Sequence, residues 1–537
     1  MDGLMMDFQL TIPALLRRAE ELYGGREIVS RLPDRSLHRY AYADFIDRSK
    51  RLALALKRLG VGPGDRVATL AWNHHAHLEA YFGVPAAGAV LHTINLRLPR
   101  EDITYITHHA DDRVLLVDEA LLPLYEAIAP TLDIPHVIVM LATRPVAEGL
   151  LDYERLIAAE DPADFTYPDL RETTAAAMSY TSGTTGRPKG VLYSHRSIVL
   201  HTLALGLAET FGISGRDTIL PVVPMFHVNA WGLPFAGVLV GSKIVLPGPH
   251  LDATSLLELF AGERVTFTGG VPTIWFGILD ALDREPGKYD LSALRTMVVG
   301  GAAAPPAMIR AFDERHHLNV VHAWGMTEMT PLGTVSHLPP EMEAADDGVK
   351  LAVRARQGIP VPFVEIRARG ENGLVPWDGR TAGELEVRGP WVASRYFGSD
   401  GPDDRFSEDG WFLTGDIVNI DPNGSIHIQD RSKDVIKSGG EWISSVILEN
   451  AIMGHPAVAE AAVIAIPDPK WQERPLACVV LREGMGASEE EILAHIAPHF
   501  PKWWIPERVA FVDAIPKTAA GKFLKSALRE RFAGKAG

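Results

Sequence analysis

Residues 180–190 read Tyr-Thr-Ser-Gly-Thr-Thr-Gly-Arg-Pro-Lys-Gly, a run rich in glycine and hydroxyl side chains that carries a lysine. Glycine lets a backbone approach a ligand closely, so that successive N–H groups can turn toward an anion. The hydroxyl donors are Thr181, Ser182, Thr184 and Thr185. Lys189 adds a positive charge, although its spacing from Gly183 and Gly186 does not fit a Walker A loop. Apolar flanks predict a strand–loop–strand unit that wraps a phosphate chain; a Gly-Thr surface turn is the alternative.

The segment His322-Ala-Trp-Gly-Met-Thr-Glu328 carries side chains that suit a nucleotide. Trp324 could stack on a base, and Thr327 could bond a phosphate. Glu328 could hold Mg²⁺, which prefers hard oxygen ligands. Taken alone, a Trp-Gly turn before a helix is the commoner meaning of such a segment.

Two further segments carry charged groups next to glycine or small residues. Asp416 follows a glycine and could accept the hydroxyls of a ribose, as acidic residues do in nucleotide sites. Arg431 could pair with phosphate, although a hairpin with an exposed ion pair is the alternative. Lys522 ends the segment Ile515-Pro-Lys-Thr-Ala-Ala-Gly-Lys522 and, taken alone, would be an ordinary solvated lysine.

Composition limits the class of protein. A chain of 537 residues should divide into several domains, and a net charge of −16 argues against nucleic-acid binding. The single cysteine, Cys478, excludes an internal disulfide framework and fits a reducing, cytoplasmic location. The first residues do not read as a secretion signal, and no apolar run approaches the roughly 20 residues of a membrane helix.

Short apolar runs alternate with amphipathic segments through most of the chain, which predicts an α/β fold with parallel-type sheets flanked by helices. The expected strands are 66–72, 89–94, 114–118 and 296–301, and the expected helices include 11–23 and 42–59. Pro and Gly cluster around 357–390, where 383–389 indicates a small β-rich unit. After residue 430 a compact α+β unit is expected, with helices at 444–453 and 488–496 and strands at 461–466 and 476–482.

In this order, the motifs resemble those of the adenylate-forming superfamily of acyl- and aryl-CoA synthetases, luciferases and peptide-synthetase adenylation domains, over nearly the whole chain. Residues 225–231 and 436–444 are most similar to bacterial medium- and long-chain fatty-acyl-CoA synthetases and the related 3-methylthiopropionate-CoA ligases. The resemblance implies an acid–thiol ligase that uses ATP, Mg²⁺ and coenzyme A. A carboxylic acid and ATP would give acyl-AMP and pyrophosphate, and CoA would then take the acyl group and release AMP. A medium- to long-chain fatty acid is the expected substrate, 3-methylthiopropionate the alternative, and transfer to a carrier protein less favoured.

The resemblance also implies three domain segments: 1–430 with the ATP and acyl sites, a hinge at 431–433, and a small mobile lid at 434–537. It implies the following roles. The β- and γ-phosphates would lie against Thr181, Ser182, Gly183, Thr184, Thr185, Gly186 and Lys189. The adenine would lie against Gly300, Gly301, Ala302, Trp324 and Gly325. Thr327 would contact the α-phosphate, Glu328 would bind Mg²⁺, and Asp416 and Arg431 would hold the ribose. Lys522 would bridge the acyl carboxylate and the α-phosphate, and Lys433 would be the hinge residue. The acyl and CoA site would include His227, Trp231, Ser438, Gly439, Gly440 and Glu441. A homodimer is also expected.

Substrate specificity is predicted from single positions. Amino-acid-activating relatives carry Asp where this chain has His227, so a free amino acid is not expected. Acetate-activating relatives carry a bulky Trp where this chain has Gly325, so an open acyl pocket is expected, with Trp231 as its gate or simply as a core residue. Three nearby histidines (His74, His75 and His77) lack the partners of a metal cluster, and we expect them on a solvated helix face.

Overall fold

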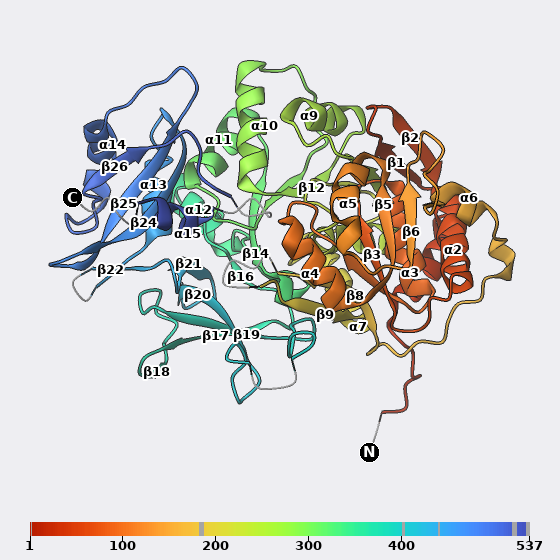
Figure 1. Cartoon of the computed structure of the whole chain (residues 1–537). Helices are drawn as coiled ribbons and strands as arrows, with labels where there is room; N and C mark the ends of the chain where they lie inside the picture. The colour runs from red at the N-terminus through yellow and green to blue at the C-terminus, as the bar shows by residue number, and fades with distance from the viewer. Residues whose placement is uncertain (2, 182–186, 400–402, 439–440, 518–522, 533–537) are drawn as a thin grey trace.

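The computed structural model describes residues 1–537 except 2, 182–186, 400–402, 439–440, 518–522 and 533–537. The chain builds two large sheets flanked by helices, a small antiparallel sheet, and a C-terminal α+β unit that lies at the opposite end from the first helices (Figure 1). The predicted α/β class is therefore confirmed, with the β-rich unit and the C-terminal unit where the sequence indicated them.

The first large sheet has strand order β7-β6-β5-β3-β4-β8-β9 and is parallel except for β9. Its strands are β3 (Arg66–Leu70), β4 (Val90–Thr93), β5 (Asp112–Asp118), β6 (His136–Met140), β7 (Leu151–Asp152), β8 (Ala175–Tyr180) and β9 (Gly190–Ser194). Helices of this part are α2 (Tyr42–Arg58), α3 (His75–Ala86), α4 (Arg100–Ala110), α5 (Leu122–Ile128), α6 (Tyr153–Ala158) and α7 (His195–Leu205). The Val- and Leu-rich strands are buried, as continuous apolar runs in parallel sheets are.

The second large sheet has strand order β16-β15-β14-β13-β12-β10-β11-β1-β2. Its strands are β1 (Glu27–Arg31), β2 (Leu37–Ala41), β10 (Thr218–Pro221), β11 (Lys243–Leu246), β12 (Phe267–Gly270), β13 (Thr296–Val299), β14 (Val320–Gly325), β15 (Leu332–Val335) and β16 (Ile359–Pro360). The accompanying helices are α1 (Ile12–Leu22), α8 (Leu233–Val240), α9 (Ala253–Gly262), α10 (Pro272–Arg284), α11 (Pro306–His316) and α12 (Asp347–Arg354). Strand β1 pairs with β11, so the start of the chain completes a sheet made mostly of much later residues.

Two smaller sheets follow. The β-rich unit has order β18-β17-β19-β20-β21, formed by β17 (Glu365–Gly370), β18 (Gly373–Leu374), β19 (Gly383–Arg388), β20 (Phe412–Ile420) and β21 (Ile426–Arg431). The C-terminal unit has order β23-β22-β25-β24 with β26 beside β25. Its elements are β22 (Ile436–Ser438), β23 (Glu441–Ile443), β24 (Val458–Asp468), β25 (Gln472–Leu481), β26 (Arg508–Phe511), α13 (Ser445–Ile452), α14 (Glu489–Ile496) and α15 (Lys525–Phe532). The domain limits at 430 and 434 stay a prediction; the first falls near the end of β21 and the second in the segment between β21 and β22.

Helix α3 lies in the middle of the core, and every one of its residues is buried. The expected solvated face for His74, His75 and His77 is therefore wrong. His74 caps the helix and bonds Asp118 at 2.6 Å, while His77 bonds the hydroxyl of Thr69 at 3.0 Å. Burial lowers the pKa of His77 to about 3, so this ring is neutral. A helix that is buried on all sides gives no periodic signal, and its polar groups have to be paired.

Within the described ranges, no helix combines the length and the apolar character that crossing a bilayer requires.

Candidate functional site

The predicted phosphate loop is held between two antiparallel strands. Tyr180 pairs with Gly190 at the ends of β8 and β9. Thr181 and Lys189 close the base of the loop by two hydrogen bonds: Thr181 N–H donates to Lys189 O, and Lys189 N–H donates to Thr181 Oγ1, both at 3.0 Å. The strand–loop–strand expectation is confirmed. Ser182, Gly183, Thr184, Thr185 and Gly186 lie outside the described residues.

Lys189 and Glu328 both contact Tyr396, the first at its ring and the second at its hydroxyl. The Lys189 ammonium lies 4.4 Å from the centre of the Tyr396 ring and 2.9 Å from Asp403 Oδ2. The Tyr396 hydroxyl donates to Glu328 Oε1 at 2.6 Å. Burial and the Glu328 charge raise the pKa of Tyr396, so it stays a donor. Sequence reasoning missed Tyr396 and Asp403, because an isolated Tyr or Asp in a loop carries no pattern.

Thr327 and Glu328 are fixed through their backbones in a short 3₁₀ turn, Thr327–Met329. The hydroxyl of Tyr193 donates to Thr327 O at 2.7 Å, and Ala393 N–H donates to Glu328 O at 2.7 Å. Tyr193 belongs to β9, the strand that leaves the phosphate loop. The structure therefore ties two motifs that are far apart in sequence into one rigid site.

Trp324, Asp416 and Arg431 form a second connected group. The indole N–H of Trp324 donates to Asp416 Oδ2 at 2.9 Å, and Arg431 Nε lies 2.8 Å from Asp416 Oδ1. Asp416 and Arg431 are register partners on β20 and β21. Both carboxylate oxygens are thus oriented, and each keeps a further lone pair for a ligand hydroxyl. The sequence predicts Trp324 as a residue that stacks on adenine and Asp416 with Arg431 as ribose ligands; the contact between Trp324 and Asp416 was not predicted.

Trp231 lies in a left-handed turn. Consecutive φ angles are 44° at Val228, 51° at Asn229, 48° at Ala230, 57° at Trp231 and 77° at Gly232. Each non-glycine residue there costs about 1–2 kcal/mol, so the surrounding packing has to impose the turn. The half-buried indole lies against the backbones of two glycines: a Cβ on Gly300 would approach Trp231 Cη2 to 3.1 Å, and one on Gly269 would approach Cε3 to 3.4 Å. His227 is half-buried and precedes this turn.

A cavity of about 250 Å³ begins at Ala303, the residue that follows Gly301 and Ala302 in the sequence. It lies between the second large sheet, the end of the β-rich unit and helix α13 of the C-terminal unit. Its lining residues are Ala303, Ala304, Pro306, Ala352, Ala355, Arg356, Gln357, His427, Ile428, Val446, Ile447 and Asn450. The mostly small, apolar wall suits a flat ring at the boundary of two domains.

The structure explains why residue 325 is a glycine, and this reason could not be predicted from the sequence. A Cβ at this position would lie 2.0 Å from Pro331 O, the same carbonyl that accepts the N–H of Met326 at 3.0 Å. No side chain fits there. Glycine is therefore required by the close approach of β14 to the start of β15, and its presence says less about an open acyl pocket than we expected.

The C-terminal unit presents the predicted CoA turn on the hairpin β22–β23. Ser438 is buried, and its register partner on the hairpin is Glu441. Lys433 lies on the segment between β21 and β22, where Arg529 donates to its carbonyl at 3.4 Å. Gly439, Gly440 and Lys522 lie outside the described residues, so their predicted roles stay predictions.

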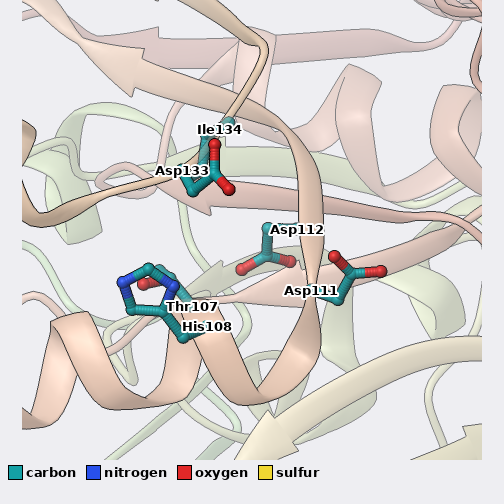
Figure 2. A pocket seen from close by; sticks show the side chains of 6 residues that line it. All are labelled: Thr107, His108, Asp111, Asp112, Asp133 and Ile134. Carbon is teal, nitrogen blue, oxygen red and sulfur yellow. The ribbon is translucent and has the colours of Figure 1, made fainter.

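A small polar hollow of about 50 Å³ at the end of α4 lies apart from these groups (Figure 2). Thr107, His108, Asp111, Asp112, Asp133 and Ile134 line it. Asp112 already accepts from His92 Nδ1 at 2.9 Å. Among the described residues, no group of three His, Cys, Asp or Glu side chains could hold a metal ion, and we assign this hollow no role.

Comparisons with known proteins agree with this arrangement. The family described as AMP-binding enzyme matches residues 16–397, and AMP-binding enzyme C-terminal domain matches 448–522. The chain is 50% identical over 533 residues to the long-chain-fatty-acid–CoA ligase of Thermus thermophilus, covering 98% of this chain and 96% of that protein. It is 47% identical over 536 residues to the 3-methylmercaptopropionyl-CoA ligase of Ruegeria pomeroyi, covering 99% and 98%. The crystal structure of the anthranilate CoA ligase AuaEII with anthranoyl-AMP superposes with a TM-score of 0.87 at 26% identity and covers 99% of each chain.

Proposed function

Because the chain belongs to the AMP-binding enzyme family and is an AMP-forming acyl-CoA ligase, we propose that its substrate is a medium- to long-chain fatty acid. The acid would react with ATP to give acyl-AMP and pyrophosphate, and CoA would then displace AMP. The observation that carries the site assignment is the group Lys189–Tyr396–Glu328 beside Trp324–Asp416–Arg431. The first group offers a cation, Lys189, and a carboxylate, Glu328. The second group offers the oriented carboxylate of Asp416.

In the first step, a carboxylate oxygen bonds to the α-phosphorus while the bond to pyrophosphate breaks. The acid is already ionised at neutral pH, so no general base is needed. The obstacle is the repulsion between an anion and a polyanion, and catalysis consists mostly of positioning and charge neutralisation. Lys189 and Lys522 would supply positive charge, Thr327 would bond the α-phosphate, and Asp416 would hold the ribose with Arg431.

Mg²⁺ fits the residues around Glu328. This buried carboxylate has one oxygen bonded to Tyr396, and no residue of the described ranges bonds its other oxygen, which can therefore take a ligand. Mg²⁺ usually binds through one or two protein carboxylates together with substrate phosphates, and Glu328 supplies one such carboxylate here. When bound, the ion would neutralise phosphate charge.

In the second step, the CoA sulfur attacks the acyl carbonyl carbon and gives its thiol proton to solvent, while the bond to AMP breaks and AMP leaves with the electron pair. We propose that Ser438, Gly439, Gly440 and Glu441 line the path of the pantetheine arm, and that rotation at Lys433 brings this turn to the site. Trp231 and His227 would form the wall of the acyl and CoA site.

The test is CoA-dependent AMP formation by the purified protein with ATP and Mg²⁺ on an acid panel from acetate to palmitate that includes 3-methylthiopropionate. A maximum at hexanoate or longer acids is expected, because each buried CH₂ adds about 0.8 kcal/mol of binding. Lys522→Ala should lower adenylation roughly 10²–10³-fold, yet spare thioester formation from ready-made acyl-AMP. Equal losses in both half-reactions would contradict the assigned role of Lys522.

A 3-methylthiopropionate ligase is the second candidate. The 47% identity to the Ruegeria pomeroyi ligase over nearly the full length favours it. A maximum at this acid in the same panel would replace the fatty-acid proposal. Absence of AMP with every acid would instead favour a carrier protein as the acceptor.

We also propose a homodimer. Several large apolar side chains of the N-terminal segment are exposed, including Leu4, Met5, Met6 and Phe8, and this segment extends away from the body of the protein (Figure 1). Exposed apolar side chains of this kind are usually covered by a partner. Light scattering should give twice the mass of one chain, and a monomer mass at micromolar concentration would reject the dimer.

The single, buried Cys478 supports a cytoplasmic location.

A further inference from the structure

Asp430 is a buried carboxylate that bonds across the predicted hinge at 431–433. It lies on β21, where its register partner is Ile417 of β20, so it belongs to the β-rich unit of the N-terminal region. Its Oδ2 accepts the backbone N–H of Ser445 at 2.6 Å and the Ser445 hydroxyl at 2.5 Å. Ser445 is the first residue of α13 in the C-terminal unit. One carboxylate oxygen therefore joins the two parts of the chain that the hinge separates.

The Ser445 hydroxyl connects this carboxylate to an ion pair inside the C-terminal unit. Lys525 donates to Ser445 Oγ at 2.6 Å and lies 2.6 Å from Glu449 Oε1. Glu449 Oε1 also accepts the N–H of Val463 on β24 at 2.7 Å. Asp430, Ser445, Glu449 and Lys525 are all buried. The contact across the hinge is thus shielded from water and tied to regular elements on both sides.

Apolar packing contributes less to this boundary, because the cavity of about 250 Å³ lies between the same two elements. Its lining includes His427 and Ile428 of β21 and Val446, Ile447 and Asn450 of α13. Side chains that line a void lose contacts on one side. Besides the two bonds of Asp430, the Ser444 hydroxyl donates to Gln429 O across the same boundary. Polar contacts therefore carry much of what sets the orientation of α13 against β21.

We propose that Asp430 and Ser445 are positioning residues for adenylation, which hold the C-terminal unit in the orientation of this structure and separate when it rotates. The inference rests on the proposed function, which assigns Lys522 of this unit to adenylation and a rotation at Lys433 to thioester formation. Strand β22 lies on the outer side of the C-terminal unit, well apart from β14 (Figure 1), so this orientation precedes the rotation. Burying a charge is costly, so one buried carboxylate can favour an orientation without making it permanent.

The experiment measures the two half-reactions separately in Ser445→Ala, which removes the hydroxyl and keeps the backbone N–H. A hydrogen bond to a charged group corresponds to roughly 10- to 100-fold in an equilibrium, so pyrophosphate exchange should fall on the order of 10-fold. Single-turnover transfer of acyl from preformed acyl-AMP to CoA should be unchanged or faster, because it uses the rotated orientation. The N–H of Arg431 bonds the other oxygen of Asp430 at 2.7 Å and is not touched, so calorimetry should show unchanged affinity for AMP.

Ser488→Ala is the matched control. Ser488 also stands at the start of a helix of the C-terminal unit, where its side chain accepts from the N–H of Glu491. This variant should leave both half-reactions unchanged. Asp430→Asn covers the case in which Ser445→Ala does not fold: it keeps the shape of the side chain, loses the charge, and should show the same selective loss. In the double variant the losses should be less than multiplicative, because both changes weaken one contact.

The orientation itself can be measured as the distance between two spin labels, one attached through Glu371→Cys in the β-rich unit and one through Glu483→Cys in the C-terminal unit. Both positions are exposed, and the single native cysteine, Cys478, is buried, so the labels attach selectively. One main distance is expected with the native Ser445. Ser445→Ala should add a second population.

Equal losses in both half-reactions, unchanged exchange, weaker AMP binding, the same loss in Ser488→Ala, or an unchanged distance distribution would each overturn the inference. Lys522→Ala separates it from the proposed function. If this variant does not lower adenylation selectively, the assigned role of the C-terminal unit in adenylation fails. If it does and Ser445→Ala does not, only the roles of Asp430 and Ser445 fail.

Discussion

Gly325→Ala is the sharpest test of the nucleotide site, because the structure leaves no room for one methyl group. The added Cβ would lie 2.0 Å from Pro331 O, 2.8 Å from Pro331 C and 3.2 Å from Leu332 Cα, all of them backbone atoms. The ends of β14 and β15 would have to separate by roughly 1 Å, at an overpacking cost of about 1–3 kcal/mol. Thr327 and Glu328 lie between these two ends. A displacement of this size should lower adenylation about 10²-fold.

Pyrophosphate exchange with decanoate and with acetate measures this effect, together with thermal unfolding. Gly277→Ala is the control: it lies in α10, and nothing is within 4 Å of its added Cβ. That variant should be fully active and slightly more stable, by about 0.5–1 kcal/mol. Wild-type exchange in Gly325→Ala with both acids would refute the close approach. Loss with decanoate alone, with acetate retained, would instead support the pocket-opening role predicted from sequence.

Three further predictions concern charged groups. Asp416→Asn keeps the shape of the side chain but removes its charge, and calorimetry should show ATP binding weakened about 10- to 100-fold; unchanged affinity would contradict the ribose assignment. Lys189→Met removes the cation over Tyr396 and should lower pyrophosphate exchange on the order of 10²-fold, whereas acyl transfer from preformed acyl-AMP should persist; losses in both would point to misfolding. Lys525 lies 2.6 Å from the buried carboxyl of Glu449, and burial raises the pKa of Glu449 to about 7. Because the pKa of Glu449 is higher in the folded than in the unfolded state, its contribution to the free energy of unfolding is complete below the unfolded-state pKa. This contribution is lost as the pH rises through about 7, where the buried carboxyl ionises in the folded protein. Urea unfolding should therefore show Lys525→Met more destabilising near about pH 8 than near about pH 5, with Lys525→Arg as the control; equal losses at both pH values would contradict the pairing.

The sheets were predictable from sequence, because buried parallel strands are short, apolar and β-branched. The runs at 66–72, 89–94 and 296–301 became β3, β4 and β13 with ends shifted by one or two residues. The C-terminal unit was predictable for a similar reason: its two long strands and two helices differ in length and periodicity. Helix α3 was misjudged, because its histidines look solvated until tertiary contacts with Asp118 and Thr69 bury them.

The candidate site was predictable only where a residue belongs to a local motif. Lys189, Trp324, Glu328 and Asp416 stand in such motifs, and the structure brings them into two connected groups. Tyr396 has no motif, and its place between Lys189 and Glu328 arises from packing of the segment between β19 and β20. The left-handed turn around Trp231 was also hidden, because only one of its residues is glycine and the conformation is imposed by neighbours.

The pairing of β1 with β11 has a consequence for synthesis of the chain. The hairpin β1–β2 leaves the ribosome early, directly after α1, but Ile28 has no partner on β11 until Ile244 has been synthesised. Meanwhile the first large sheet, β3 to β9, can form completely from residues that lie between these two partners. The strands of the first large sheet therefore lie, in sequence, between β1 and β11, the two paired strands of the second large sheet. Until β11 is made, β1 is paired only with β2 and its other edge has no partner, and unpaired edges are where nascent chains aggregate. This arrangement therefore leaves one edge of the N-terminal hairpin open to incorrect pairing until β11 has been synthesised.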